Sequence, residues 1–103
     1  MREGPPSQED LSAGTQVVEF HAPWCGPCRA FAKTFEDVSS RKEYEGDGFW
    51  TVDMSTEEGQ EVAARYSIRT IPTIVVFVDG AVSEILVGAD VTEAKLTKAI
   101  NHN

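Results

Sequence analysis

The two cysteines of this sequence, Cys25 and Cys28, have the types and spacing that most directly predict chemistry. They are the only cysteines among the 103 residues, and they lie between a strand-like run, residues 15–20, and a helix-like run, residues 29–44. Unpaired backbone N–H groups and the helix dipole favour an anion at a helix start, so the first cysteine is placed to react as a thiolate. Three-residue spacing also lets the second sulfur close a small disulfide ring. The pattern predicts a redox-active pair.

Glu19 is a third candidate, because it stands between Val18 and Phe20 in the strand-like run. An acid in an apolar strand is expected to avoid the interior. If the side chain is buried, its pKa rises toward neutrality, and such a carboxyl group suits proton exchange. The alternative, which the sequence leaves open, is a glutamate that faces solvent on a partly exposed strand.

Hydrophobic periodicity and turn residues predict the elements that position these side chains. A strand–helix–strand unit requires a parallel pair with a right-handed crossover, and the two-residue turn Asp79-Gly80 predicts an antiparallel hairpin. The sequence therefore predicts an α/β fold with a mixed sheet. The expected strands are 15–21, 49–54, 73–78 and 81–87, the expected helices are 7–13, 29–44, 55–66 and 92–100, and residues 1–6 are expected to form a flexible tail.

Four segments of the chain together resemble the thioredoxin family, in order and in rough spacing. They are Val18-Glu-Phe-His-Ala-Pro-Trp-Cys-Gly-Pro-Cys28, Tyr66-Ser-Ile-Arg-Thr-Ile-Pro-Thr73, Val78-Asp-Gly80 and Val87-Gly-Ala89. The resemblance covers roughly residues 15–100. It implies a thioredoxin-like fold with a central mixed four-stranded sheet flanked by helices. The polar N-terminus is too short for the family's additional first strand, which we expect to be missing or rudimentary. We expect a single domain overall, with a tail and short helix at 1–14 and the thioredoxin-like domain at 15–103.

The resemblance also implies a thiol–disulfide oxidoreductase that reduces protein disulfides and needs no cofactor beyond its own cysteine pair. In such a protein Cys25 is the nucleophile, Cys28 resolves the mixed disulfide, and Glu19 exchanges a proton with Cys28. A thioredoxin reductase or an equivalent electron donor recharges it. The family pattern assigns site-shaping roles to Trp24, Gly26, Pro27 and Pro72, the last after a cis peptide bond, and substrate binding to Trp24, Thr70, Ile71, Val87, Gly88 and Ala89.

The chain departs from the family pattern at two positions near this site. The family places a lysine beside the buried acid, where this sequence has Phe49, so Glu19 either lacks a partner or takes Lys33 or Lys42 instead. The family also has an aromatic residue, commonly Trp, where this sequence has His21. Because imidazole can donate the hydrogen bond that an indole would make, we predict that His21 lies within hydrogen-bond reach of Asp53, directly or through one water. The alternative is a histidine that only fills space.

Two other classes of function remain open from the residues. His21, Cys25 and Cys28 form an H-x3-C-x2-C pattern that could bind a metal or an iron–sulfur cluster, with His102 or a second chain as a fourth ligand. The chain could also be a non-catalytic partner subunit that uses its apolar face and not its thiols.

Composition narrows the partners and the compartment. Seventeen acidic and nine basic residues give a formal charge of −8, which argues against nucleic-acid binding because phosphate contact needs clustered Lys and Arg. No apolar run approaches membrane-spanning length. Two cysteines in a sequence without an N-terminal apolar signal indicate a reducing cytoplasm. We expect a cytoplasmic monomer.

Overall fold

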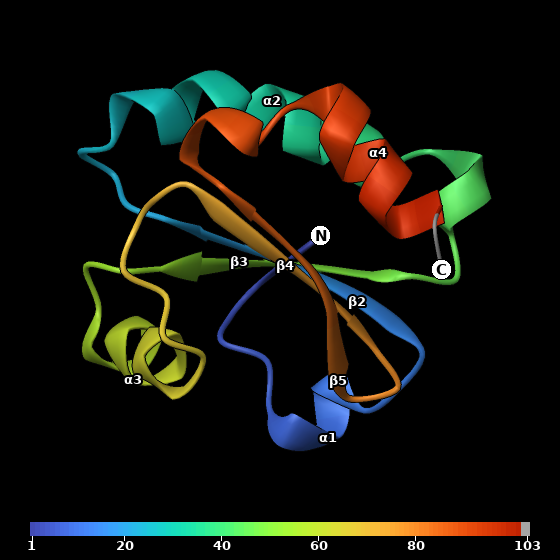
Figure 1. The fold of residues 1–103 in the computed structure, drawn as a ribbon, viewed down its shortest axis with the longest axis horizontal. Coiled ribbons are helices and arrows are strands. Elements are labelled where there is room, and N and C mark those ends of the chain that lie inside the picture. Colours follow the sequence, from blue (N-terminus) through green and yellow to red (C-terminus); the bar gives the residue numbers. More distant parts are fainter. Residues whose placement is uncertain (102–103) are drawn as a thin grey trace.

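A computed structural model describes residues 1–101 and shows one mixed sheet between two layers of helices (Figure 1). Helices α2 and α4 cover one face of the sheet, and α1 and α3 lie against the other. Among residues 1–101, no helix has the length and apolar character needed to cross a bilayer. The strands are β1 (Arg2–Glu3), β2 (Thr15–His21), β3 (Gly48–Asp53), β4 (Thr73–Val78) and β5 (Ala81–Val87), and the helices are α1 (Gln8–Leu11), α2 (Gly26–Ser39), α3 (Glu57–Arg65) and α4 (Glu93–Asn101).

The strand order is β1-β3-β2-β4-β5, which confirms the predicted mixed sheet. β2 pairs with β3 in parallel and with β4 antiparallel, and β4 pairs antiparallel with β5. Asp79 and Gly80 have φ values of 51° and 89°, as the predicted hairpin turn requires. The carboxyl ends of β2 and β3 and the amino end of β4 therefore meet at one end of the sheet.

The N-terminus differs from the expected flexible tail, because Arg2 and Glu3 add a short fifth strand. They pair in parallel with Trp50 and Thr51 on β3, and the N–H of Gly4 donates to the Thr51 carbonyl at 2.8 Å. The Arg2 guanidinium lies 4.9 Å from the centroid of the Trp50 ring, which adds a cation–π contact. The first strand is present but rudimentary, so the sheet has five strands and not four.

Helix α2 begins and ends earlier than the predicted span of residues 29–44. It starts at Gly26 with Cys25 as its N-cap and ends at Ser39, and a separate 3-10 turn covers Lys42–Tyr44. Tyr44 is buried, lies 6.1 Å from Phe49 between ring centroids, and donates its hydroxyl to Asn101 at 2.9 Å. Contacts with β3 and α4 thus fix this segment, and such contacts cannot be predicted from helix periodicity alone.

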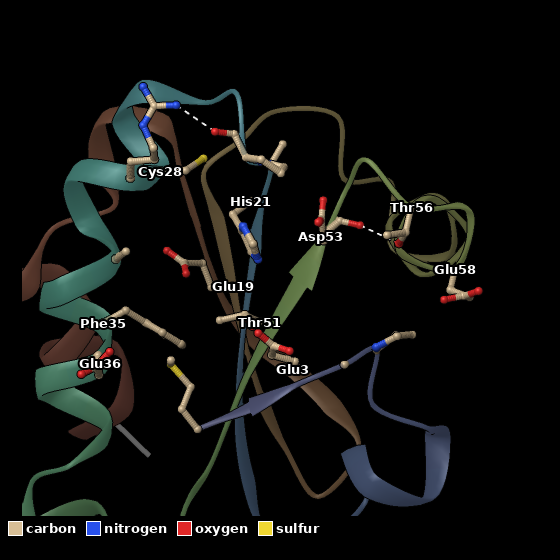
Figure 2. A pocket seen from close by; sticks show the side chains of 17 residues that line it. Glu3, Glu19, His21, Cys28, Phe35, Glu36, Thr51, Asp53, Thr56 and Glu58 are labelled. Atoms are coloured by element: carbon tan, nitrogen blue, oxygen red, sulfur yellow. Dashed lines mark hydrogen bonds between the residues drawn. The ribbon is translucent and has the colours of Figure 1, made fainter.

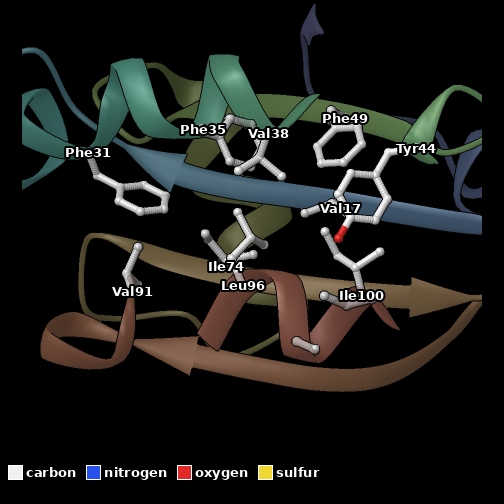
Figure 3. Packing of buried hydrophobic residues seen from close by; sticks show 12 residues of the cluster. Val17, Phe31, Phe35, Val38, Tyr44, Phe49, Ile74, Val91, Leu96 and Ile100 are labelled. Atoms are coloured by element: carbon white, nitrogen blue, oxygen red, sulfur yellow. The ribbon is translucent and has the colours of Figure 1, made fainter. Parts of the chain in front are cut away.

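Alternation along β2 assigns its residues to two hydrophobic clusters. Val17 packs with Phe31 and Phe35 of α2 and with residues of α4 (Figure 3). Val18 and Phe20 pack on the opposite face. Because side chains alternate along a strand, Glu19 must share the α2 face with Val17. This placement decides how the functional site is built.

Candidate redox-active site

Cys25 and Cys28 form a disulfide at the amino end of α2, with their Cα atoms 5.3 Å apart. Cys25 is the N-cap residue, and its Sγ accepts a hydrogen bond from the backbone N–H of Cys28 at 3.2 Å. Pro27 occupies the first turn, where its missing N–H leaves no intrahelical bond unmade. Backbone donors and the helix dipole therefore converge on Cys25 Sγ and favour a thiolate there once the disulfide is reduced.

Glu19 is buried beneath this helix end, as the first of the two sequence interpretations predicted. Its side chain is 3% exposed, and Oε2 has no hydrogen-bond partner among residues 1–101. Burial without a compensating partner disfavours the carboxylate and raises the pKa of Glu19 to about 7. The group can therefore take up and release a proton near neutral pH.

A cavity of about 780 Å³ lies between Glu19 and Cys28 (Figure 2). Cys28 and Glu19 both line it, together with Thr51 on β3 and Ala32 on α2. The N-terminal segment also contributes lining residues, so the rudimentary β1 forms part of the cavity rim. Cys25 is not among the lining residues that the structure describes, so the two sulfurs lie toward different surroundings.

Among residues 1–101, no lysine replaces the family's partner for the buried acid. Phe49 occupies that position and packs against Phe35 with ring centroids 5.7 Å apart. Lys33 is exposed and donates to Asp37 at 3.1 Å, and Lys42 is exposed in the 3-10 turn. The expectation that Lys33 or Lys42 could pair with Glu19 is therefore wrong, because both side chains lie in solvent.

Among residues 1–101 His21 and Asp53 form no direct hydrogen bond, which was one of the two predicted forms of their pairing. The two residues are register partners on β2 and β3 and line the same cavity, but Asp53 Oδ1 accepts from the Ser55 N–H at 2.8 Å and from the Ser55 hydroxyl at 2.7 Å. These bonds hold the pKa of Asp53 below its ordinary value, and the nearby His21 adds a smaller contribution in the same direction. A local turn after β3 thus satisfies the carboxylate that His21 was expected to bind.

The residues expected to bind substrate gather around the disulfide from three parts of the chain. The Ile71–Pro72 peptide is cis, as predicted, and Ile71 packs against the cluster of Ala22, Cys25 and Cys28. The N–H of Gly88 donates to the Pro72 carbonyl at 2.9 Å, which joins the end of β5 to this loop. Trp24 and Val87 are 71% and 43% exposed. Thr70 and Ala89 are also exposed, and they are the sequence neighbours of Ile71 and Gly88.

Sequence reasoning missed two residues that shape the site. Thr51 is the register partner of Glu19 on β3 and lines the same cavity (Figure 2). Arg29 donates from Nη1 to the Pro23 carbonyl at 2.8 Å. The hydrogen bond from Arg29 ties the active-site loop to the first turn of α2. Period-two alternation could have assigned Thr51 to the face of Asp53, but the β2–β3 register that brings it to Glu19 cannot be read from the sequence.

The described residues do not provide the ligands that the metal-binding alternative requires. Within residues 1–101, no three His, Cys, Asp or Glu side chains come together in an arrangement that could hold a metal ion. His102, considered above as a fourth ligand, lies outside the described residues.

Comparison with known proteins gives a consistent answer. The family model for thioredoxin matches residues 7–102. Thioredoxin 1 of Nostoc sp. is 41% identical over 83 residues, which are 80% of this chain and 75% of the relative. The thioredoxin of Bacillus subtilis is 38% identical over 85 residues, which are 82% of this chain and 79% of the relative. The structure of Fasciola hepatica thioredoxin superposes with a TM-score of 0.77 at 36% identity, over 91% of this chain and 85% of that one. The structure of Malassezia sympodialis thioredoxin superposes with a TM-score of 0.82 at 30% identity, over 98% of this chain and 88% of that one. With its Cys25–Cys28 disulfide and this match along most of its length, the chain belongs to the thioredoxin family and is a thiol–disulfide oxidoreductase.

Proposed function

We propose that the protein reduces disulfides in other proteins, with Cys25 as nucleophile, Cys28 as resolving thiol and Glu19 as the acid–base group. One observation carries the assignment of roles: Cys28 shares a cavity with the buried, unpartnered Glu19, whereas Cys25 caps the helix. The sulfur that needs its proton removed late in the reaction thus has a base on its own side.

In the first step the Cys25 thiolate attacks one sulfur of a substrate disulfide. A bond forms between Cys25 Sγ and that sulfur, and the substrate disulfide breaks, releasing the other substrate sulfur as a thiolate that takes a proton from solvent. The N–H of Cys28, 3.2 Å from Cys25 Sγ, and the start of α2 stabilise the attacking thiolate. The product is a mixed disulfide through Cys25.

In the second step Glu19 takes the thiol proton of Cys28, and the resulting thiolate attacks Cys25 Sγ. The Cys25–substrate bond breaks, the second substrate sulfur leaves, and the Cys25–Cys28 disulfide forms. Two electrons have passed to the substrate. A pKa of about 7 suits Glu19 to this transfer, because the base must be partly ionised at the pH where the thiol must lose its proton.

Substrate and donor engage the protein on the Cys25 side in this proposal. Trp24, Ile71 and Val87 supply exposed or half-buried apolar area beside the disulfide, with Thr70, Gly88 and Ala89 around them. A thioredoxin reductase or an equivalent dithiol donor returns two electrons to the disulfide after each cycle. We propose that the protein works as a monomer in a reducing compartment such as the cytoplasm, where such a donor keeps the pair reduced.

An insulin-reduction assay, with and without a thioredoxin reductase and its electron source, tests this function. We expect the protein to accelerate insulin precipitation with dithiothreitol and to turn over repeatedly with the reductase alone. Cys25→Ser should abolish both activities. If the Cys25→Ser/Cys28→Ser double variant keeps full biological activity in cells, the protein is instead a non-catalytic partner subunit.

A further inference from the structure

A row of exposed apolar side chains runs along β5 on the sheet face that carries α1 and α3. Val82, Ile85 and Val87 are 45%, 47% and 43% exposed. Their direct partners across the hairpin are Phe77, Val75 and Thr73, each at most 1% exposed. Because direct cross-strand partners share a face, the row lies on the same face as the second hydrophobic cluster, which contains Val18, Phe20, Val75 and Phe77.

The β4–β5 pairing keeps these three residues on one face. The register shifts between Val76 and Phe77, so that Glu84 opposes Val76 while Val82 opposes Phe77. The extra residue in β5 is a bulge that brings Val82 back to the face of Ile85, although the two are three positions apart. Glu84 is the only charged residue of β5, and it lines the groove beneath α4 on the other face. The row is therefore uncharged as well as apolar.

The same strand ends the sheet. In the described part of the chain β5 pairs with β4 alone, so its outer edge is unpaired with any strand. Natural edge strands are commonly protected by charged side chains or proline. This edge has neither on the apolar face, which suits it to pair with an added strand.

The row begins beside the loop that adjoins the disulfide. Val87 opposes Thr73, which follows Pro72, and Ile71 of this loop packs against the cluster that contains both cysteines and against the second cluster. From Val87 the row leads away from the site to Val82, roughly 15 Å at about 3.3 Å per residue. A polypeptide whose cystine lies at Cys25 can continue directly onto this surface.

We propose that Val82, Ile85 and Val87 bind an extended segment of the substrate protein, next to its disulfide, which adds to the edge of β5 as a further strand. The inference rests on the proposed reduction of protein disulfides and specifies the substrate class. Favoured substrates carry apolar side chains at alternate positions beside the reactive cysteine, since these point toward the row. Small disulfides reach Cys25 without using it.

Two synthetic disulfides test the proposal: a peptide cystine flanked by Val-Ser-Val-Ser, and bis(2-hydroxyethyl) disulfide. In Ile85→Lys we expect kcat/KM for the peptide to fall about tenfold, because the aliphatic contact that peptide binding would bury is lost. We expect kcat/KM for the small disulfide to stay unchanged. Ile85→Thr keeps a β-branched residue in the strand and should show a smaller loss in the same direction. Ala94→Lys adds the same charge on exposed α4 and should match wild type with both substrates.

Three results would overturn the inference. The first is an unchanged peptide rate in Ile85→Lys, and the second is an equal loss with both disulfides, which places the effect at the cysteines. The third is self-association of the wild type that Ile85→Lys abolishes in sedimentation experiments, because the row is then covered by a second copy of the chain. Failure of the wild type to reduce either disulfide would instead refute the proposed function, so the two failures are distinguishable.

Discussion

At the scale of single residues, the site depends on the different surroundings of two chemically identical side chains. Cys25 caps a helix, where a negative charge is favoured, and Cys28 lies one turn later beside a cavity that it shares with Glu19. Each is almost fully buried in the oxidised protein, at 6% and 4% exposed. Exposure alone therefore does not distinguish the roles of the two cysteines. The electrostatic environment of each sulfur distinguishes them.

We expect Cys28→Ser to accumulate a mixed disulfide through Cys25, because the thiol that would resolve it is missing. Mass spectrometry after incubation with a protein disulfide should find a covalent adduct in this variant and none in Cys25→Ser. An adduct on Cys25→Ser alone would reverse the assignment of the two roles.

Glu19→Gln should slow the resolving step about a hundredfold at pH 7, the size of effect that loss of a general base commonly has. In the wild type this step should accelerate as pH rises through about 7, because the carboxylate is the active form. The variant should lose that dependence. Stopped-flow release of substrate thiol from the mixed disulfide measures it, and a pH profile identical to wild type would remove Glu19 from the mechanism.

The same substitution should raise stability at alkaline pH. The folded-state pKa of Glu19 is about 7, above its ordinary 4.5, so the folded protein holds a proton that the unfolded chain releases. The resulting penalty is absent below pH 4.5, grows between 4.5 and 7, and reaches about 3 kcal/mol above 7. Thermal unfolding of Glu19→Gln and wild type should therefore coincide near pH 4 and diverge by pH 8. Glu61→Gln, on the exposed face of α3, should show no such divergence.

At the scale of elements, the site depends on where the ends of β3 and α3 meet. Thr56 caps α3 through a 3.0 Å bond from the Gly59 N–H, and its hydroxyl donates to the Asp53 carbonyl at 2.9 Å (Figure 2). Gly59 is buried against the last residue of β3, and a Cβ there would overlap the backbone oxygen of Asp53. This close approach holds α3 against the strand end that lines the cavity.

Gly59→Ala should therefore destabilise the protein by about 1–3 kcal/mol, as overpacking does, although alanine favours a helix interior by about 1 kcal/mol. Guanidinium unfolding measures the difference. Gly46→Ala is the matched control, because no atom lies within 4 Å of a Cβ at that position. A stabilised Gly59→Ala would show that α3 moves freely away from β3.

Much of this architecture could be predicted from local sequence. Thr15–His21 and Thr73–Val78 have strong strand patterns, Asp79-Gly80 fixes a hairpin, and Ser7 and Thr92 act as the expected helix caps. The errors fell where distant contacts decide the structure. Arg2 and Glu3 become a strand only because β3 offers an edge, and Tyr44 lies in a separate 3-10 turn that contacts Phe49 and Asn101.

At the scale of the whole molecule, the N-terminal segment links stability to the chemistry. β1 covers the outer edge of β3, and Met1, Glu3 and Gly4 form part of the cavity that reaches Glu19. The segment makes few contacts, but we expect it to affect both the stability of the sheet and the hydration of Glu19.

Deletion of residues 1–4 should lower stability by about 1–3 kcal/mol, since the deletion removes backbone hydrogen bonds to β3 and the Arg2–Trp50 contact. It should also open the cavity to water and shift the pH dependence of the resolving step to lower pH, because Glu19 is then less desolvated. Arg2→Gln loses only the ring contact and should leave the pH profile unchanged. A deletion variant with the wild-type pH profile would show that β1 does not control the hydration of Glu19.

The placement of the two sulfurs has an evolutionary consequence. Cys25 follows Trp24 and packs in a cluster with Ala22 and Ile71, on the side where we propose that substrates dock, while Cys28 lines the cavity that it shares with Glu19. Substitutions at separate sites that share no partners act nearly additively. The choice of client proteins and the pH range of the reaction are therefore separable traits, and selection can adapt a descendant of this chain to a new compartment without altering the set of proteins it serves.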